Sequence, residues 1–311
     1  MKKLQYHTIL NTFLIFSLTA TLLLTWSCSS EQPGGDREDQ PFVFLFMSDL
    51  QADPQKADYS GVGSLLARAV EEGKPELLLL GGDTVNDGAD QDEWLAFHEA
   101  TGTSLTGLTV AAAAGSHDGY ALLAEQFTLP SSAPEKPGQG YFYAFSMNGV
   151  HFSMLDSNIM GAANPEDVAW LKEALSGAEA KGAHWRIAVC HHPFWPVAEV
   201  PKDVARARTM RAHFLPLLEE YKVDLLLVGH QHVYARSLPM RGENPAEAGL
   251  IQVMAASGDK PSYTPEPRPY LALTAESTCY VLISATVNEL AVTAYDSSGA
   301  IIDFFTIKKE E

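Results

Sequence analysis

The feature of this sequence that most constrains its fold is a series of short runs that are almost continuously apolar. Strands buried on both faces read in this way, whereas a strand with one face in water alternates apolar and polar residues. Amphipathic segments that favour helices separate the runs. We therefore expect an α/β domain whose mixed sheets are covered by helices. Its strands are predicted over Phe42–Met47, Leu77–Leu80, Thr109–Ala113, Tyr141–Phe145, Val150–Leu155, Trp185–Cys190 and Leu225–Val228.

The sequence patterns that indicate helices lie between these runs. The C-terminal part instead has a pattern that indicates strands. Asn164 stands at a favourable N-cap position before a proline that suits the first helical turn. The last 35 residues read as three antiparallel strands that turn near Asn288 and Ser298-Gly299. Helices are predicted over Gly63–Glu72, Pro165–Ala180 and Ala205–Tyr221.

Polar residues of two kinds, Asp and His, follow five of the predicted strands, often beside glycine. Ligands of open α/β sheets bind outside the carboxyl ends of the strands, so these side chains are expected to converge on one site. Glycine lets the backbone approach closely at such positions. The five segments are Ser48-Asp49-Leu50-Gln51, Gly81-Gly82-Asp83, Gly115-Ser116-His117-Asp118, His191-His192-Pro193 and Gly229-His230-Gln231-His232.

Convergent carboxylates and imidazoles suit a borderline metal ion such as Zn, Mn or Fe. A carboxylate shared by two ions, with imidazoles on each, makes a reasonable clamp for displacement at phosphorus. The chain has 21 Lys and Arg against 39 Asp and Glu, a net charge of −18. That balance argues against a protein that coats nucleic acid. Two bound metal ions would reverse the local field and allow a phosphorylated small molecule as substrate.

The five segments, in this order, resemble the calcineurin-like metallophosphoesterase superfamily. The segment from Gly229 to Arg236 is most similar to its purple acid phosphatase branch, and the resemblance covers Phe42 to about Ile307. It implies a four-layer αββα sandwich of two mixed sheets, with two divalent or trivalent metal ions (Fe, Zn or Mn) at one end. By position, the first ion would be held by Asp49, Asp83 and His232, and the second by Asp83, His191 and His230.

The same resemblance implies roles in catalysis. A hydroxide held by the metal ions would attack phosphorus, and His117, oriented by Asp118, would protonate the leaving oxygen. His192 stands beside a proposed ligand. It is a candidate for lining the substrate pocket, and the alternative is that it supports His191 from behind.

Three positions depart from the family pattern. Gln51 stands where many members have a metal-binding histidine, Asn86 where purple enzymes have a tyrosine, and Ser116 where most have an asparagine ligand. Gln51 and Ser116 are kept as weaker candidate ligands, which makes the second ion the less firmly held. The main hypothesis is an exported metal-dependent phosphoesterase acting on a monoester or diester. The rival is a weakly active or non-catalytic surface lipoprotein that binds a phosphorylated or glycan ligand.

The N-terminus reads as an export signal. Lys2 and Lys3 precede an apolar stretch, and Ser27-Cys28 resembles a lipoprotein processing box. We expect residues 1–27 to be a signal peptide, residues 28–40 a flexible tether, and residues 41–311 the phosphoesterase domain. A lipid on Cys28 would anchor the protein to a bacterial membrane on the periplasmic or cell-surface side. Cleavage without a lipid and an uncleaved anchor helix are the alternatives.

Overall fold

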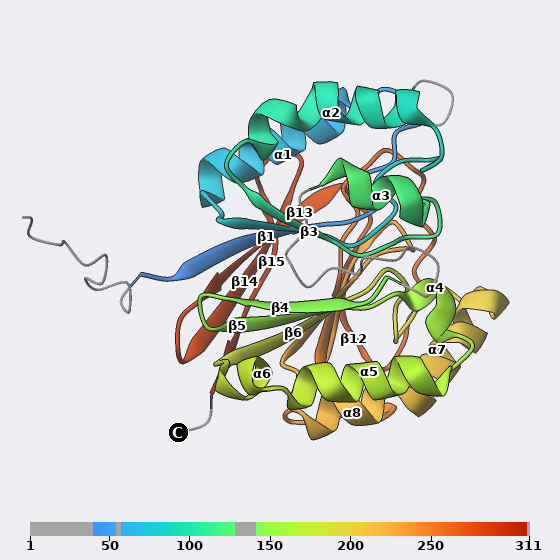
Figure 1. The fold of residues 1–311 in the computed structure, drawn as a ribbon, viewed down its shortest axis with the longest axis vertical. Coiled ribbons are helices and arrows are strands. Elements are labelled where there is room, and N and C mark those ends of the chain that lie inside the picture. Colours follow the sequence, from blue (N-terminus) through green and yellow to red (C-terminus); the bar gives the residue numbers. More distant parts are fainter. Residues whose placement is uncertain (1–39, 54–56, 128–140, 310–311) are drawn as a thin grey trace, which may run out of the picture. The chain divides into compact units, whose positions relative to one another are not determined.

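Two mixed β-sheets face each other, and helices cover the outer face of each sheet (Figure 1). The computed structural model describes residues 40–53, 57–127 and 141–309, which all belong to one compact unit, Glu38–Glu311. The four-layer αββα sandwich is confirmed. The predicted signal peptide, Cys28 and residues 29–39 of the tether lie outside the described residues.

The first sheet has six strands in the order β15-β14-β13-β1-β2-β3. Its three N-terminal strands run parallel, and the C-terminal three form the predicted antiparallel meander. Helices α1 (Ser60–Gly73) and α2 (Gln91–Leu105) cover its outer face (Figure 1). The strands are β1 (Phe42–Met47), β2 (Leu77–Leu80), β3 (Thr109–Ala112), β13 (Cys279–Ala285), β14 (Glu289–Asp296) and β15 (Ile301–Lys308).

The second sheet has seven strands in the order β12-β8-β11-β7-β6-β5-β4. Its central strands β5, β6, β7 and β11 are parallel. Strand β7 has the continuous apolar run that predicts a strand buried on both faces, whereas β11 was not predicted. The strands are β4 (Tyr143–Met147), β5 (Val150–Met154), β6 (Trp185–Val189), β7 (Leu225–Val228), β8 (Tyr234–Ser237), β11 (Ile251–Met254) and β12 (Leu271–Ala275), beside a small pair β9 (Met240–Arg241) and β10 (Asn244–Pro245).

Helices cover the outer face of the second sheet, and some of the connections between strands contain short helices (Figure 1). None of the described helices is long and apolar enough to cross a membrane. The helices are α3 (Tyr120–Gln126), α4 (Ser157–Met160), α5 (Pro165–Ser176), α6 (Ala178–Gly182), α7 (Pro201–His213) and α8 (Leu215–Glu220).

A dry core joins the inner faces of the two sheets. The rings of Phe44 on β1 and Phe152 on β5 meet edge to face, with centroids 5.3 Å apart. Tyr143 on β4 donates its hydroxyl to the carbonyl of Ala112 on β3 at 2.9 Å, so even the polar atom of this buried ring is satisfied. These contacts hold the sheets in register and thereby fix how their strand ends meet.

Two predicted helices are each divided in the structure. Pro165–Ala180 breaks at Gly177, whose extended backbone (ψ 164°) separates α5 from α6. Ala205–Tyr221 begins earlier, at Pro201, and breaks at Phe214. Pro216 explains the second break, because it has no N–H for the helix ladder and its ring crowds the carbonyl one turn earlier, so it is tolerated only in the first turn of a new helix.

Candidate metal centre and active site

The predicted site residues come from loops that leave the carboxyl ends of β1, β2, β3, β6 and β7. The two sheets meet at these ends, so loops of the first sheet face loops of the second. Glycine permits the contact. A Cβ added to Gly115 would lie 2.1 Å from the backbone nitrogen of Asp83, and one added to Gly229 would lie 2.1 Å from Oδ2 of Asp49. The glycines beside the Asp and His residues are therefore needed for the loops to approach each other.

Four candidate ligands adopt left-handed backbone conformations that are uncommon for residues other than glycine. Their φ angles are 52° at Asp49, 54° at Asp83, 77° at His230 and 50° at His232. Such conformations cost about 1–3 kcal/mol each and concentrate at functional sites. Their occurrence at four predicted ligands is independent support for a site here.

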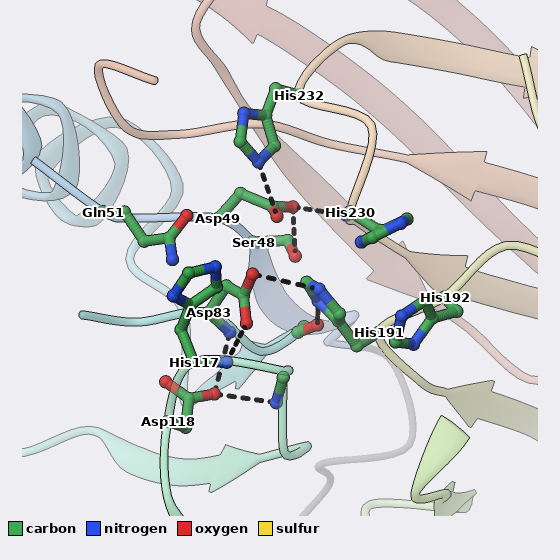
Figure 2. Close-up of polar contacts among 12 residues, drawn as sticks. Ser48, Asp49, Gln51, Asp83, His117, Asp118, His191, His192, His230 and His232 are labelled. Carbon is green, nitrogen blue, oxygen red and sulfur yellow. Dashed lines mark hydrogen bonds and ion pairs between the residues drawn. The ribbon is translucent and has the colours of Figure 1, made fainter. Parts of the chain in front are cut away.

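Asp49 is held by backbone and side-chain donors. Its Oδ2 accepts from the backbone N–H of His230 at 2.8 Å and from the hydroxyl of Ser48 at 2.9 Å. Its Oδ1 lies 3.4 Å from Nε2 of His232. Asp49 is therefore fixed through one oxygen while the other faces an imidazole (Figure 2).

Asp83 stands between the histidines of two loops. Its Oδ1 accepts from the backbone N–H of His117 at 2.9 Å, and its Oδ2 lies 3.2 Å from Nε2 of His191 (Figure 2). Burial acts to raise the pKa of Asp83, but the neighbouring His191 outweighs it and holds that pKa below its usual value. Burial likewise acts to lower the pKa of His191, but Asp83 and Asp49 raise it to about 9. In the metal-free protein both shifts favour a charged pair, with an imidazolium on His191 and a carboxylate on Asp83.

Three imidazoles are anchored in the same way, by a backbone carbonyl at Nδ1. The carbonyls of Gly81, Asn86 and Pro261 lie 3.0, 2.6 and 3.1 Å from Nδ1 of His191, His117 and His232, respectively. A carbonyl can only accept, so Nδ1 carries the hydrogen in each ring. The Nε2 atoms are thereby left for the site, which is the arrangement that orients metal-binding histidines.

The carboxylate of Asp118 is directed at the backbone. Its Oδ2 accepts from the N–H groups of Asp83 (2.7 Å) and Gly115 (2.8 Å), and its Oδ1 accepts from that of Thr84 (2.7 Å). Burial, and then the charge of Asp83, raises the pKa of Asp118 to about 6. Asp118 therefore ties the β2 and β3 loops together. The resemblance implied that Asp118 orients the His117 ring, but in the structure Nδ1 of this ring contacts the backbone carbonyl of Asn86.

His192 and His230 are held by side chains of α4 and α7. His230 has its Nε2 3.0 Å from Oδ1 of Asp203, and its ring centroid lies 4.2 Å from that of His192. His192 pairs its Nδ1 with the hydroxyl of Ser157 at 2.9 Å, and its Nε2 contacts Nη1 of Arg206. A guanidinium only donates, so this Nε2 is an acceptor. Burial is the main cause that lowers the pKa of both His192 and His230, and His192 stays neutral.

The two weaker candidate ligands differ in position. Gln51 is fully buried, and its Nε2 donates to the carbonyl of Val85 at 3.2 Å. Ser116 is exposed. Asn86, at the tyrosine position, is partly buried and donates its Nδ2 to the carbonyl of Ala52 at 3.0 Å. Thus Gln51 belongs to the buried side of the site, whereas Ser116 lies at its surface.

Two groups of donor atoms, which share His191, are close enough to hold a metal ion. Ligand atoms of Asp49, Asp83 and His191 lie within 4.8 Å of one another, as do those of His191, His192 and His230. The buried amide oxygen of Gln51, Oε1, lacks a hydrogen-bond partner within the described part of the chain, which leaves it available to a cation. The Nε2 atoms of His191 and His230 instead face Asp83 and Asp203, at 3.2 and 3.0 Å.

Sequence reasoning missed Asp203 and Arg206, which approach the histidines from α7. No motif marks them. The one available signal was composition, because α7 carries Lys202, Arg206, Arg208 and Arg211 in a chain of net charge −18. Four cations on one 13-residue helix are out of keeping with the rest of this acidic protein.

A family model for calcineurin-like phosphoesterases matches residues 42–234. The chain therefore belongs to the calcineurin-like phosphoesterase family, and within it the similarity is to purple acid phosphatases. It is 31% identical over 112 residues to purple acid phosphatase 23 of Arabidopsis thaliana, a match that covers 36% of this chain and 24% of the plant protein. The chain thus aligns with about a quarter of that relative's length.

Solved structures share the fold. The purple acid phosphatase PPD1 from yellow lupin seeds superposes with a TM-score of 0.70 at 15% identity, covering 87% of this chain and 54% of the lupin chain. GAP50 of Plasmodium, described as the anchor in the inner membrane complex, superposes with a TM-score of 0.67 at 16% identity, covering 88% of this chain and 90% of its own.

Proposed function

We propose that this protein is an exported, metal-dependent phosphoric ester hydrolase that acts on a phosphate monoester or diester. The observation that carries the proposal is the cluster of Asp49, Asp83 and His191, whose ligand atoms lie within 4.8 Å of one another where the two sheets meet. Membership of the calcineurin-like phosphoesterase family supports the same reaction class.

The chain's own residues would supply the ligands of both metal ions. Asp49, Asp83 and His232 are suited to hold one ion, and Asp83, His191 and His230 the other, with Asp83 shared. Bound ions of this kind are Lewis acids that stabilise charge on the phosphoryl oxygens and make water reactive near neutral pH. Gln51 offers a buried amide oxygen on the side of Asp49.

His117 is proposed as the acid for the leaving group. Its Nδ1 is occupied by the carbonyl of Asn86, so a proton on Nε2 is the one available for transfer. Its side chain is exposed, and its backbone N–H donates to Asp83, which places it at the mouth of the cluster. In the reaction, water adds to phosphorus, the bond from phosphorus to the leaving oxygen breaks, and the His117 proton passes to that oxygen. The attacking water gives its proton to solvent.

The test combines metal content with turnover. Purified protein would be analysed for Fe, Zn and Mn and assayed with 4-nitrophenyl phosphate and bis(4-nitrophenyl) phosphate. We expect bound metal and turnover of one ester or both, with both properties lost in Asp83→Asn. Asp92→Asn, on the exposed first turn of α2, is the matched control. Wild-type protein that binds metal and turns over neither ester would overturn the proposal.

Export and anchoring rest on the N-terminal sequence. With Cys28 as a lipidated residue, Cys28→Ser should move the protein from the membrane fraction to the soluble fraction. More than one acyl chain is needed for stable anchoring, so loss of the modified cysteine should release the protein completely. Unchanged membrane retention would favour an uncleaved anchor helix instead.

The rival function is a binding protein of little or no activity, and one observation favours it. Ser116, at the position of a family asparagine ligand, is exposed. In that case the same assay would show turnover of neither ester, and a separate binding measurement would show a phosphorylated or glycan ligand bound. The carboxylates and histidines of the cluster weigh against this rival, because a binding protein needs no leaving-group acid.

A further inference from the structure

A pocket of about 530 Å³ lies between α4 and α7, beside the candidate metal centre. Asn158 and Thr209 line it together with two cations, Lys202 and Arg206, and none of the described residues that line it is an aspartate or glutamate. Gly161 forms part of the wall, and a Cβ there would come within 3.5 Å of the Arg206 side chain. We call this the α4–α7 pocket.

Direct contacts link the α4–α7 pocket to the metal centre on two sides. Arg206 contacts Nε2 of His192, whose ring packs against that of His230, a candidate ligand. On the other side, Asn158 donates its Nδ2 to the carbonyls of Ala114 and Gly115 at 3.2 and 3.1 Å. These carbonyls begin the loop that carries His117. Through these contacts, Arg206 and Asn158 each lie next to a residue or loop of the candidate centre.

The charge of the pocket is unusual for this protein. Within residues 40–53, 57–127 and 141–309, neither Lys202 nor Arg206 forms an ion pair with a carboxylate within 4 Å. Asp203, the nearest acid on the same helix, is already engaged with His230 and Gln231. Arg206 is half-buried, where a charge interacts more strongly than in open water. Lys202 thus has no carboxylate partner among these residues. Arg206 contacts His192 and lies in the field of Asp203 and Asp156, and its guanidinium has further N–H groups for an anion in the pocket.

We propose that the α4–α7 pocket binds a second phosphate group of the substrate, so that the preferred substrate is a small molecule with two phosphates. One phosphate would be hydrolysed at the metal centre, while the other, on the alcohol part, is held by Lys202 and Arg206. The inference rests on the proposed function and narrows its substrate class. Hydrogen bonds between a cation and phosphate are the strong ones, so the pocket should discriminate clearly between one phosphate and two.

The first test compares fructose 1,6-bisphosphate with fructose 6-phosphate. We expect wild-type kcat/KM to be about 10- to 100-fold higher for the bisphosphate. Lys202→Ala should bring this ratio down by about tenfold, mainly through KM. Arg208→Ala, on the same helix but outside the pocket lining, should leave the ratio unchanged. A wild-type ratio near one, or equal changes in both variants, would overturn the inference.

A second test keeps the inference distinguishable from the proposed function. Inorganic phosphate would be titrated calorimetrically into chelator-treated protein, which has no catalytic metal. We expect binding at one site in wild type and in Arg208→Ala, and at least tenfold weaker binding in Lys202→Ala. If no ester is turned over but this pattern holds, the proposed function fails and the anion pocket stands. Absence of binding, or equal binding by all three proteins, overturns the pocket whatever the turnover.

Discussion

The two halves of the candidate site are held in place by different means. On the first-sheet side, the carboxylate of Asp118 fastens the Asp83 loop to its own loop through three backbone N–H groups. On the second-sheet side, the rings of His192 and His230 are held by side chains of α4 and α7. Backbone contacts fix a position more rigidly than contacts between rotatable side chains. In the proposed centre, the first ion would thus meet preorganised ligands, whereas the second would require His230 to exchange Asp203 for the ion.

The largest effect is expected at His117, which belongs to the rigid side. His117→Ala should lower kcat by about 10²–10⁴, because the leaving oxygen then departs without a proton. Metal content should stay at the wild-type level, as measured by elemental analysis. Parallel loss of metal would mean that His117 is a ligand or a structural residue, and the rigid side would need a new description.

The second prediction sharpens the contrast at Ser116. Ser116→Asn restores an amide ligand next to the weaker position, so we expect second-site affinity to rise by about 10- to 100-fold. Wild-type protein should purify with fewer than two metal ions per chain and respond to added Mn or Zn. Equilibrium dialysis measures both. Two tightly held ions in the wild type would show that the second-sheet side is as well ordered as the first.

The third prediction concerns His191, which joins the two halves. Its pKa is raised to about 9 from an ordinary 6.5 in the metal-free protein. A raised pKa stabilises the fold fully below pH 6.5, and this contribution is lost as the pH rises through about 9. Urea unfolding of chelator-treated protein should therefore show a loss on the order of 1 kcal/mol between pH 6.5 and 9. His191→Gln should flatten the slope, whereas an unchanged slope would assign it to other groups.

The same proton competes with metal. Because Nδ1 of His191 already bears a hydrogen, a metal ion can bind only when Nε2 gives up its proton. Apparent metal affinity should therefore rise with pH across this window, opposite in direction to the stability of the metal-free protein. Calorimetric titration with Zn or Mn at several pH values would measure it.

The smallest expected effect is an absence of colour. In the purple enzymes that this chain resembles, a tyrosinate bound to ferric iron produces the visible absorption. Asn86 occupies that position and has an amide in place of a phenolate. Protein loaded with iron should show no strong visible band, and the spectrum is the measurement. A strong band would mean that another residue acts as the phenolate.

The predictable part of this molecule was the part that lies in local patterns. The bounds of strands such as Phe42–Met47 and Leu77–Leu80 were predicted to the residue. Strands that are buried on both faces are near-continuous apolar runs, and polar or turn residues mark where such a run ends. The strand-end Asp and His residues converge as the rule for α/β sheets requires. Cys190 and Cys279 are buried free thiols, as is common for cysteines that do not form disulfides.

What could not be predicted depends on tertiary contacts. Helix α2 has only Trp94, Phe97 and Thr101 buried, too narrow an apolar face to stand out from the sequence. The partners of His230 and His192 lie on α7, 27 and 14 residues away, and no local pattern links them. The engagement of Asp118 with backbone N–H groups likewise depends on how two loops cross.

The left-handed backbone at Asp49, Asp83, His230 and His232 has a consequence for protein engineering. Glycine adopts such a conformation without strain, so glycine at His232 would relax the chain while removing an imidazole from the centre. A library screened for heat resistance alone is therefore expected to enrich glycine at these positions and to yield proteins that are more stable to heat but no longer bind metal. Selection for activity has to accompany every round, because at these four positions thermal stability and metal binding favour different residues.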